Sequence, residues 1–344
     1  MNSDDLLEKK ENVKDYCLFQ KDYNIGDLLG KYFPIWKNAN KIYLKSLHEH
    51  IDYNRKENVS YSRWSNFSCE DKIFDLNCKF KLDIQANRYT YQDDYDKANE
   101  MHWYKNFADS HLFVAYYSSL FAQDEIQVAE HPILANLLCA VQSENSEESH
   151  TLTIENGLPR PILIQNAVRK IDIDTVNYPI YGNAFARAYE ETIKQATRVL
   201  NPPSSTNFLC IQAPACGYGR YSLNSIKHIF STAYSGYKAI KFETNKKLGE
   251  NSACALHTGN WGCGAYGGNH LLMAILQILA ARCAQLDEVV YHTYNQTLKA
   301  HAEEGLNIIQ KIIKEDSDIN WINIDNCLQK IYDYKFQWNF SDGN

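Results

Sequence analysis

A glycine-rich stretch is the part of this sequence best suited to hold an anion. Residues 257–269 read HTGNWGCGAYGGN, with four glycines between Gly262 and Gly268. An apolar run over residues 271–281 follows at once and has helical character. Glycine leaves backbone N–H groups unobstructed, and the N-terminal end of a helix favours negative charge. The stretch therefore predicts a phosphate site, with a diphosphate as its natural guest.

Three carboxylates far upstream could do glycosidic chemistry beside such a phosphate. Asp109 precedes a helix that we expect to begin near Ala122, and Asp124 and Glu125 fall in the first turn of that helix. Acids in a first turn are also stabilised simply by the helix dipole, so their position alone does not make them catalytic. Within the whole constellation, an anionic group that stabilises an oxocarbenium-like state is the better explanation for at least one of them.

Aromatic side chains beside turns could complete a nucleotide site. The candidates are Tyr181, Phe185 and Tyr266. Tyr266 would cover ribose or phosphate, and Tyr181 and Phe185 would stack on a base, although core packing explains both of these equally well. A phosphate cradle, carboxylates and ring faces together suit a nucleotide diphosphate-sugar.

The elements that must position these residues alternate between strands and helices. Short apolar runs at 161–168, 207–213 and 288–293 predict buried strands, and residues 111–117 resemble a further one. Helices are predicted at 184–200 and 223–234. Residues 1 to about 100 suggest a mostly helical accessory region, and 296–335 an amphipathic helical one packed outside. The alternation predicts an α/β sandwich.

Composition excludes several classes of protein. The chain has 344 residues, 44% of them hydrophobic, and a net charge of −7, which argues against a nucleic-acid partner. None of the ten cysteines forms a Cys-x-x-Cys pair, so we expect reduced thiols and no zinc site. The acidic N-terminus lacks the apolar core of a Sec signal, and no apolar run reaches membrane-spanning length. We expect a cytoplasmic protein, or one exported into a host cell by a non-Sec route.

Three segments together resemble the poly(ADP-ribose) glycohydrolase family. Residues 258–269, the helix after them and the run VVYHT at 289–293 are similar to the family's diphosphate loop, helix and last strand. NFAD at 106–109 and QDEI at 123–126 resemble the family's Asp-Phe-Ala-Asn and Gln-Glu-Glu-Ile segments, and AYSGY at 233–237 a segment before its loop. The resemblance covers roughly Tyr104 to Tyr294.

The resemblance implies a fold, a division of the chain and a ligand site. The fold would be a macrodomain-like mixed sheet sandwiched by helices, with the macrodomain core over residues 101–295, an accessory region over 1–100 and C-terminal helices over 296–344. ADP-ribose would be the ligand, with no cofactor and no metal. The implied ligand-binding residues are Phe107, Ala108, Gln123, Tyr181, Phe185, Gly259, Asn260, Trp261, Gly262, Cys263, Gly264, Ala265, Tyr266 and Gly267.

Departures from the family's pattern narrow the implied reaction. The family's triple glycine falls on residues 113–115, here Phe-Val-Ala, which argues against cleavage of the ribose–ribose bond of the polymer. Asp109 puts a carboxylate where the family has an amide. Clustered carboxylates need a cation, and a guanidinium is the cation best shaped for them. The substrate implied is therefore ADP-ribose on a protein arginine, as in the arginine-specific macrodomain effectors of intracellular bacteria.

Several alternatives stay open from the sequence. Asp124 and Glu125 are equal candidates for the base that activates water, and Asp109 could instead hydrogen-bond a ribose hydroxyl. A non-catalytic ADP-ribose reader and a poly(ADP-ribose) glycohydrolase are the competing functions. A Cys263–His257 nucleophile is rejected, because Cys263 lies between glycines in a phosphate-type loop.

Overall fold

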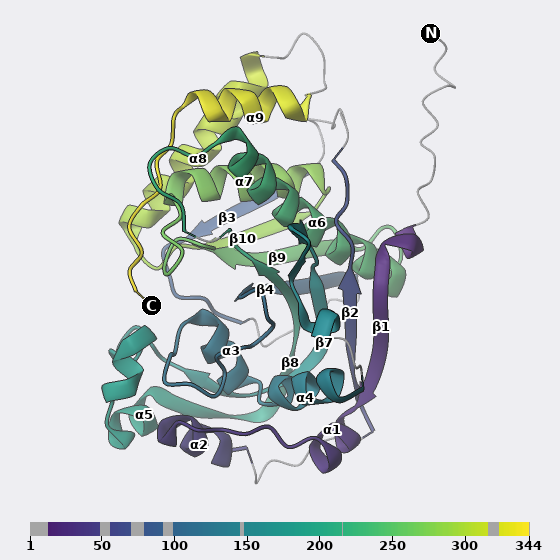
Figure 1. The fold of residues 1–344 in the computed structure, drawn as a ribbon, viewed down its shortest axis with the longest axis vertical. Helices are drawn as coiled ribbons and strands as arrows, with labels where there is room; N and C mark the ends of the chain where they lie inside the picture. The colour runs from purple at the N-terminus through teal and green to yellow at the C-terminus, as the bar shows by residue number, and fades with distance from the viewer. Residues whose placement is uncertain are drawn as a thin grey trace.

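A mixed eight-stranded β-sheet forms the centre of the molecule (Figure 1). The computed structural model describes residues 13–48, 56–69, 79–91, 99–144, 148–214, 216–315 and 323–343. The sheet has the order β1-β2-β7-β8-β4-β9-β10-β3. Its strands are β1 (Cys17–Asn24), β2 (Asn58–Trp64), β3 (Lys81–Gln85), β4 (Glu100–Ala108), β7 (Ile162–Ile173), β8 (Thr197–Gln212), β9 (Ala253–Gly259) and β10 (Glu288–His292). A separate hairpin pairs β5 (Ile154–Glu155) with β6 (Leu158–Pro159). The predicted macrodomain-like fold is confirmed.

One half of the sheet is parallel, and this half determines where the site forms. β8, β4, β9, β10 and β3 run parallel to their neighbours, whereas β1, β2, β7 and β8 pair antiparallel. Ala108 pairs with Gln212 at the ends of β4 and β8, and Gly259 pairs with His292 at the ends of β9 and β10. Because parallel strands end at the same edge of a sheet, the loops that follow them converge there.

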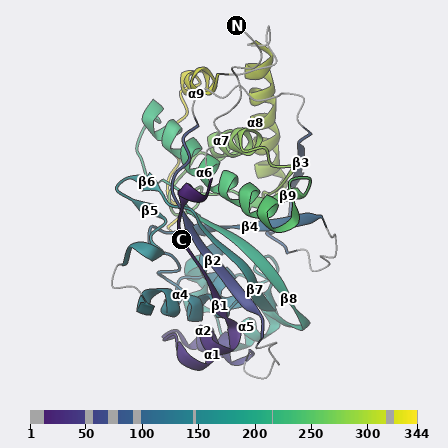
Figure 2. The ribbon, with the colours of Figure 1, turned by 90° about the vertical axis from the view of Figure 1, so that its right-hand side faces the viewer.

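Helices cover both faces of the sheet, as Figure 2 shows from the side. α6 (Leu223–Leu248), α7 (His270–Cys283), α8 (Gln296–Glu315) and α9 (Ile324–Asp333) share one apolar core with the sheet. α1 (Ile25–Lys31), α3 (Gln123–Glu130) and α4 (Ile133–Glu144) share a second core. α2 (Ala39–Ser46) and α5 (Glu190–Ala196) pack into a third. Three short 3-10 turns lie at Val13–Tyr16, Glu148–Thr151 and Gly182–Arg187.

The expectation of a mostly helical region over residues 1–100 is wrong for the described residues. This part supplies β1, β2 and β3, so a boundary at residue 100 cuts through one continuous sheet. β2 has polar Ser62 and Arg63 buried in the sheet, which hides its strand pattern in the sequence. Arg63 is tolerated there because its guanidinium pairs with Glu155 and donates to the Leu152 carbonyl.

Two further predicted elements differ from the structure. Residues 111–117 form turns instead of a buried strand, with Val114 N donating to His111 O and Tyr116 N to Phe113 O. The helix predicted at 184–200 is a 3-10 turn followed by α5, and β8 begins at Thr197. β8 pairs with β7 on both sides of the Pro-Pro pair, at residues 197–199 and again from 204 to 210, and this pairing overrides the helical pattern.

Candidate functional site

The glycine loop joins the end of β9 to the start of α7, and close contacts explain its glycines. A Cβ on Gly259 would lie 2.6 Å from the His292 carbonyl oxygen, and one on Gly268 would lie 2.6 Å from the Gly262 carbonyl oxygen. Gly268 N donates to that same oxygen of Gly262 at 2.8 Å and closes the loop on itself. Trp261 is fully buried beneath the loop, where its ring N–H donates to Ile211 O. The loop is therefore held in one shape.

Gly262 gives a direct test of that shape. It has φ +75° and a Cβ there would lie 2.6 Å from Ala213 Cβ, whereas Gly157 has φ +74° with open space around it. We expect Gly262→Ala to lower the free energy of unfolding by about 2–4 kcal/mol and Gly157→Ala by about 1 kcal/mol, because only the first adds a steric clash to the strained φ. Urea denaturation of both variants measures the difference. Equal losses would contradict the close packing of the loop.

Two buried carboxylates open the helix that follows β4. Asp124 and Glu125 lie in the first turn of α3 and are only 7% and 4% exposed. Asp124 Oδ1 accepts from Asn106 Nδ2 at 2.8 Å, and Glu125 Oε2 accepts from the Ala122 N–H at 2.9 Å. The expected helix start near Ala122 is confirmed. These bonds fix both carboxylates at the sheet edge where the parallel strands end.

The two carboxylates differ in how firmly each holds a proton. Burial raises the pKa of Asp124, and the adjacent Glu125 charge raises it further, to about 8. Burial also raises the pKa of Glu125, but the Lys41 ammonium opposes this rise. Lys41 is itself fully buried on α2, and burial lowers its pKa to about 8. Burial and the Glu125 charge thus favour the protonated form of Asp124, whereas the Lys41 ammonium favours the charged form of Glu125.

Asp109 joins the carboxylates to the glycine loop. Its Oδ2 accepts from the Tyr266 hydroxyl at 3.0 Å, and its Oδ1 accepts from Ser110 Oγ at 2.8 Å and from the His111 N–H at 3.2 Å. Burial alone would raise the pKa of Asp109, but these hydrogen bonds to the charged form outweigh it and lower the pKa. Asp109 is therefore a fixed negative charge at neutral pH, in the same cavity as Asp124, whose pKa is raised.

One cavity of about 740 Å³ brings these groups together. The predicted residues that line it are Phe107, Ala108, Asp109, Gln123, Asp124, Glu125, Tyr181, Gly259, Asn260, Gly262, Cys263, Gly264, Ala265 and Tyr266. Gln123 bridges the sheet edge, because its Oε1 accepts from Phe107 N and its Nε2 donates to Lys105 O. Burial raises the pKa of the Cys263 thiol and keeps it neutral, in agreement with the rejection of Cys263 as a nucleophile.

Three predicted ligand-binding residues do not line the cavity. Phe185 is 0% exposed and stacks on Phe121 in the core at 3.9 Å between ring centroids, so its predicted role in stacking on a base is wrong. Trp261 supports the loop from below, and its backbone amide is already bonded to Gly259 O. Gly267 donates its amide to Gly264 O, and the chain's C-terminal residues cover it. Tyr181 does reach the cavity, with its ring edge-on to Tyr294 at 6.4 Å.

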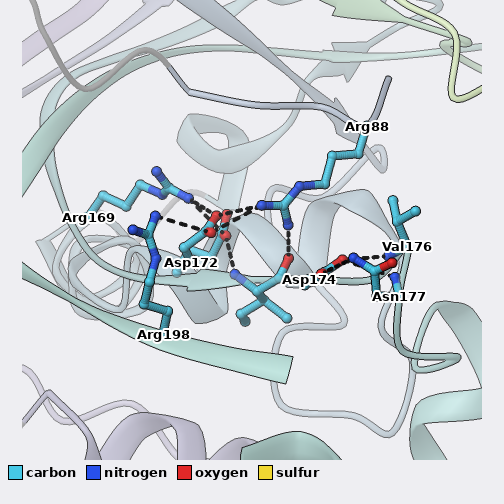
Figure 3. A network of polar contacts seen from close by, with 9 residues as sticks. Arg88, Arg169, Asp172, Asp174, Val176, Asn177 and Arg198 are labelled. Carbon is cyan, nitrogen blue, oxygen red and sulfur yellow. Dashed lines mark hydrogen bonds and ion pairs between the residues drawn. The ribbon is translucent and has the colours of Figure 1, made fainter. Parts of the chain in front are cut away.

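Several cavity residues were missed because they come from segments interpreted as accessory. They are Arg88, Tyr89, Tyr91, Leu298, Asn339, Phe340 and Asp342, whereas His270, His292 and Tyr294 were missed within the predicted core. Arg88 enters from the residues after β3 and is held by Asp172 Oδ2 at 3.0 Å and by the Ile173 carbonyl at 2.7 Å (Figure 3). Arg169 and Arg198 converge on the same carboxylate. No local sequence signal pairs Arg88 with an acid 84 residues away.

The turn at residues 113–115 has one feature typical of glycine. Phe113 has φ +55° and is completely buried, so a bulky side chain occupies a left-handed conformation. Val114 and Ala115 line the cavity. The Ala115 carbonyl accepts from Lys41 Nζ at 3.3 Å. The turn therefore presents side chains, as well as backbone, to any ligand.

The fold and the site define a macrodomain-like α/β protein with buried acids beside a glycine loop. The family model described as Poly (ADP-ribose) glycohydrolase (PARG), Macro domain fold, matches residues 173–301. The range includes the glycine loop, α7 and β10, and the three carboxylates lie upstream of it. The predicted resemblance to this family is confirmed over the matched residues.

Solved structures of two bacterial enzymes are also similar to the chain. Poly(ADP-ribose) glycohydrolase from Thermomonospora curvata matches with 13% identity and a TM-score of 0.44, covering 82% of this chain and 88% of that one. The enzyme from Deinococcus radiodurans in complex with ADP-ribose matches with 9% identity and a TM-score of 0.43, covering 86% and 98%.

The described residues also bear on metal binding and on membrane insertion. Among the described residues, no group of three or more His, Cys, Asp and Glu side chains is arranged to hold a metal ion. In the same part of the chain, no helix has the length and apolar character needed to cross a membrane.

Proposed function

We propose that this protein is an ADP-ribosylhydrolase that removes mono-ADP-ribose from modified protein, with arginine as the modified residue. The observation that supports it best is the shared cavity, in which Asp109, Asp124 and Glu125 face the same space as the glycine loop. The loop would hold the diphosphate, Tyr181 and Tyr294 would flank the nucleoside, and the acids would lie at the anomeric carbon of the distal ribose.

The two acids would have different roles in the reaction, because burial and neighbouring charges act differently on their pKa values. Glu125, whose charged form the Lys41 ammonium stabilises, accepts a proton from water as the water oxygen bonds to the ribose anomeric carbon. Asp124, whose pKa is raised to about 8, gives its proton to the guanidine nitrogen as the C–N bond breaks. The products are free ADP-ribose and an unmodified arginine, and the two acids exchange protons with solvent to restore the starting state.

Asp109 would select the arginine linkage. Its carboxylate is ionised and held by Tyr266, so it presents a fixed anion to a guanidinium. We expect Asp109→Asn, which keeps the shape and removes the charge, to lower kcat/KM on arginine-linked ADP-ribose about tenfold, and serine-linked turnover much less. Parallel assays on the two linkages measure this ratio. An equal loss on both linkages would assign Asp109 to the ribose hydroxyls instead.

A panel of ADP-ribosylated proteins tests the proposal as a whole. Purified protein should release free ADP-ribose from arginine-modified protein faster than from serine- or glutamate-modified protein, and should leave polymer chains intact. The competing function is a non-catalytic reader. Val114 and Ala115 favour it, because they line the cavity where the resemblance implies the family's triple glycine. Calorimetric binding of ADP-ribose with no release from any linkage would establish the reader and overturn the hydrolase.

A further inference from the structure

The chain's own C-terminal residues lie across the glycine loop. We define the C-terminal strap as residues 336–343, which follow α9 and descend beside the loop in Figure 1. The strap bonds to the loop along its length: Asn339 N donates to Gly267 O at 2.8 Å, Asn339 Nδ2 to Gly268 O at 3.2 Å, and Asp342 N to Gly264 O at 3.4 Å. The glycine loop therefore holds the strap in place.

Both ends of the strap are anchored outside the loop. Trp338 stacks on Tyr221 with 4.0 Å between ring centroids, and a Cβ on Gly217 would lie 2.2 Å from its ring. At the far end, Asn183 Nδ2 donates to Gly343 O at 2.6 Å. The residues between these anchors cover the loop, and Asn339, Phe340 and Asp342 form part of the cavity wall.

Asp342 places a carboxylate against Gly264 of the glycine loop. Its Oδ2 lies 3.2 Å, and its Oδ1 3.6 Å, from the point where a Cβ on Gly264 would be. A carboxylate and a phosphate are both anions that compact, unobstructed backbone can accept. Between the anchors, Phe340 is 94% exposed and contributes little packing to hold the strap down.

We propose that the strap is an intramolecular competitor, in which Asp342 occupies the diphosphate position of the glycine loop until a nucleotide displaces it. The inference rests on the proposed function insofar as ADP-ribose is the displacing ligand. Two anions in contact at one position repel each other, so the Asp342 carboxylate must leave when a diphosphate arrives. The middle of the strap is loosely packed, so it can lift from the glycine loop while Trp338 stays stacked on Tyr221.

Charge removal at Asp342 is the first test. Calorimetry with ADP-ribose should show that Asp342→Asn binds about tenfold more tightly than the unaltered protein, because the competing anion is gone. The matched control is Asp333→Asn, an exposed acid on α9 outside the cavity, which should leave the affinity unchanged. Equal affinities for Asp342→Asn and the unaltered protein, or weaker binding by Asp342→Asn, would overturn the proposal.

Hydrogen exchange on the full chain is the second test. Saturating ADP-ribose should slow exchange in the peptide that contains residues 259–268 and speed it in the peptide that contains residues 339–343. Slower exchange in both peptides would make the strap a fixed wall of the site and overturn the competition. Tighter binding by Asp342→Asn together with no hydrolysis of any linkage would contradict the proposed activity while supporting the strap.

Discussion

Glu125→Gln should lower the rate of ADP-ribose release from arginine-modified protein about 10³-fold, within the range that loss of a general base gives. Glutamine keeps the volume of the side chain, and its carbonyl oxygen can still accept the bond that Ala122 N donates to Glu125. The variant loses only the ability to take a proton from water. Affinity for free ADP-ribose should therefore change by no more than about threefold, since binding of the product does not use the base.

Single-turnover release and calorimetric binding, measured on the same preparation, separate these two effects. Glu304→Gln, an exposed acid on α8, is the charge-matched control and should retain full activity. A Glu125→Gln variant that still turns over at the normal rate would remove Glu125 from the reaction and make Asp124 the candidate base. Loss of binding along with activity would instead indicate damage to the α3 N-terminus.

Asp124→Asn should lower activity about 10²-fold and at the same time stabilise the fold, because Asp124 is a buried acid held for chemistry. In the unfolded chain this carboxyl ionises near pH 4, whereas burial and the Glu125 charge raise its folded pKa to about 8. Between these values the folded state binds more protons than the unfolded state, so Asp124 lowers stability as pH rises from 4 to 8. Asparagine removes that dependence.

Urea denaturation at pH 5 and pH 8.5 measures this effect. We expect Asp124→Asn to raise the free energy of unfolding by roughly 2 kcal/mol at pH 8.5 and by less at pH 5. Asp333→Asn, which changes an exposed acid, should shift neither value. A variant that is less stable than the unaltered protein at pH 8.5 would show that the charged Asp124 is favourable in the fold.

The sequence by itself determined the parts of the site that depend on local chemistry. The glycine loop, the helix that begins beside Ala122, and β7, β8 and β10 were all predicted, because glycines, first-turn acids and continuous apolar runs signal structure over a few residues. The family resemblance followed from the same short segments, and the model match at 173–301 agrees with it. The sequence did not show which of the two carboxylates holds its proton more firmly. Asp124 and Glu125 differ by only one methylene group, and their different neighbours are present only in the folded chain.

Only the tertiary structure decided which distant residues complete the site. β1, β2 and β3 join the sheet through pairing partners more than 30 residues away, so their pattern was read as a helical accessory region. Phe185 and Tyr181 look alike in the sequence, yet the first packs on Phe121 and the second reaches the cavity. Lys41, Arg88 and Asp342 reach the acids, the cavity wall and the loop through folding alone. Burial, charge proximity and backbone contact are properties of the packed chain, and no spacing along the sequence encodes them.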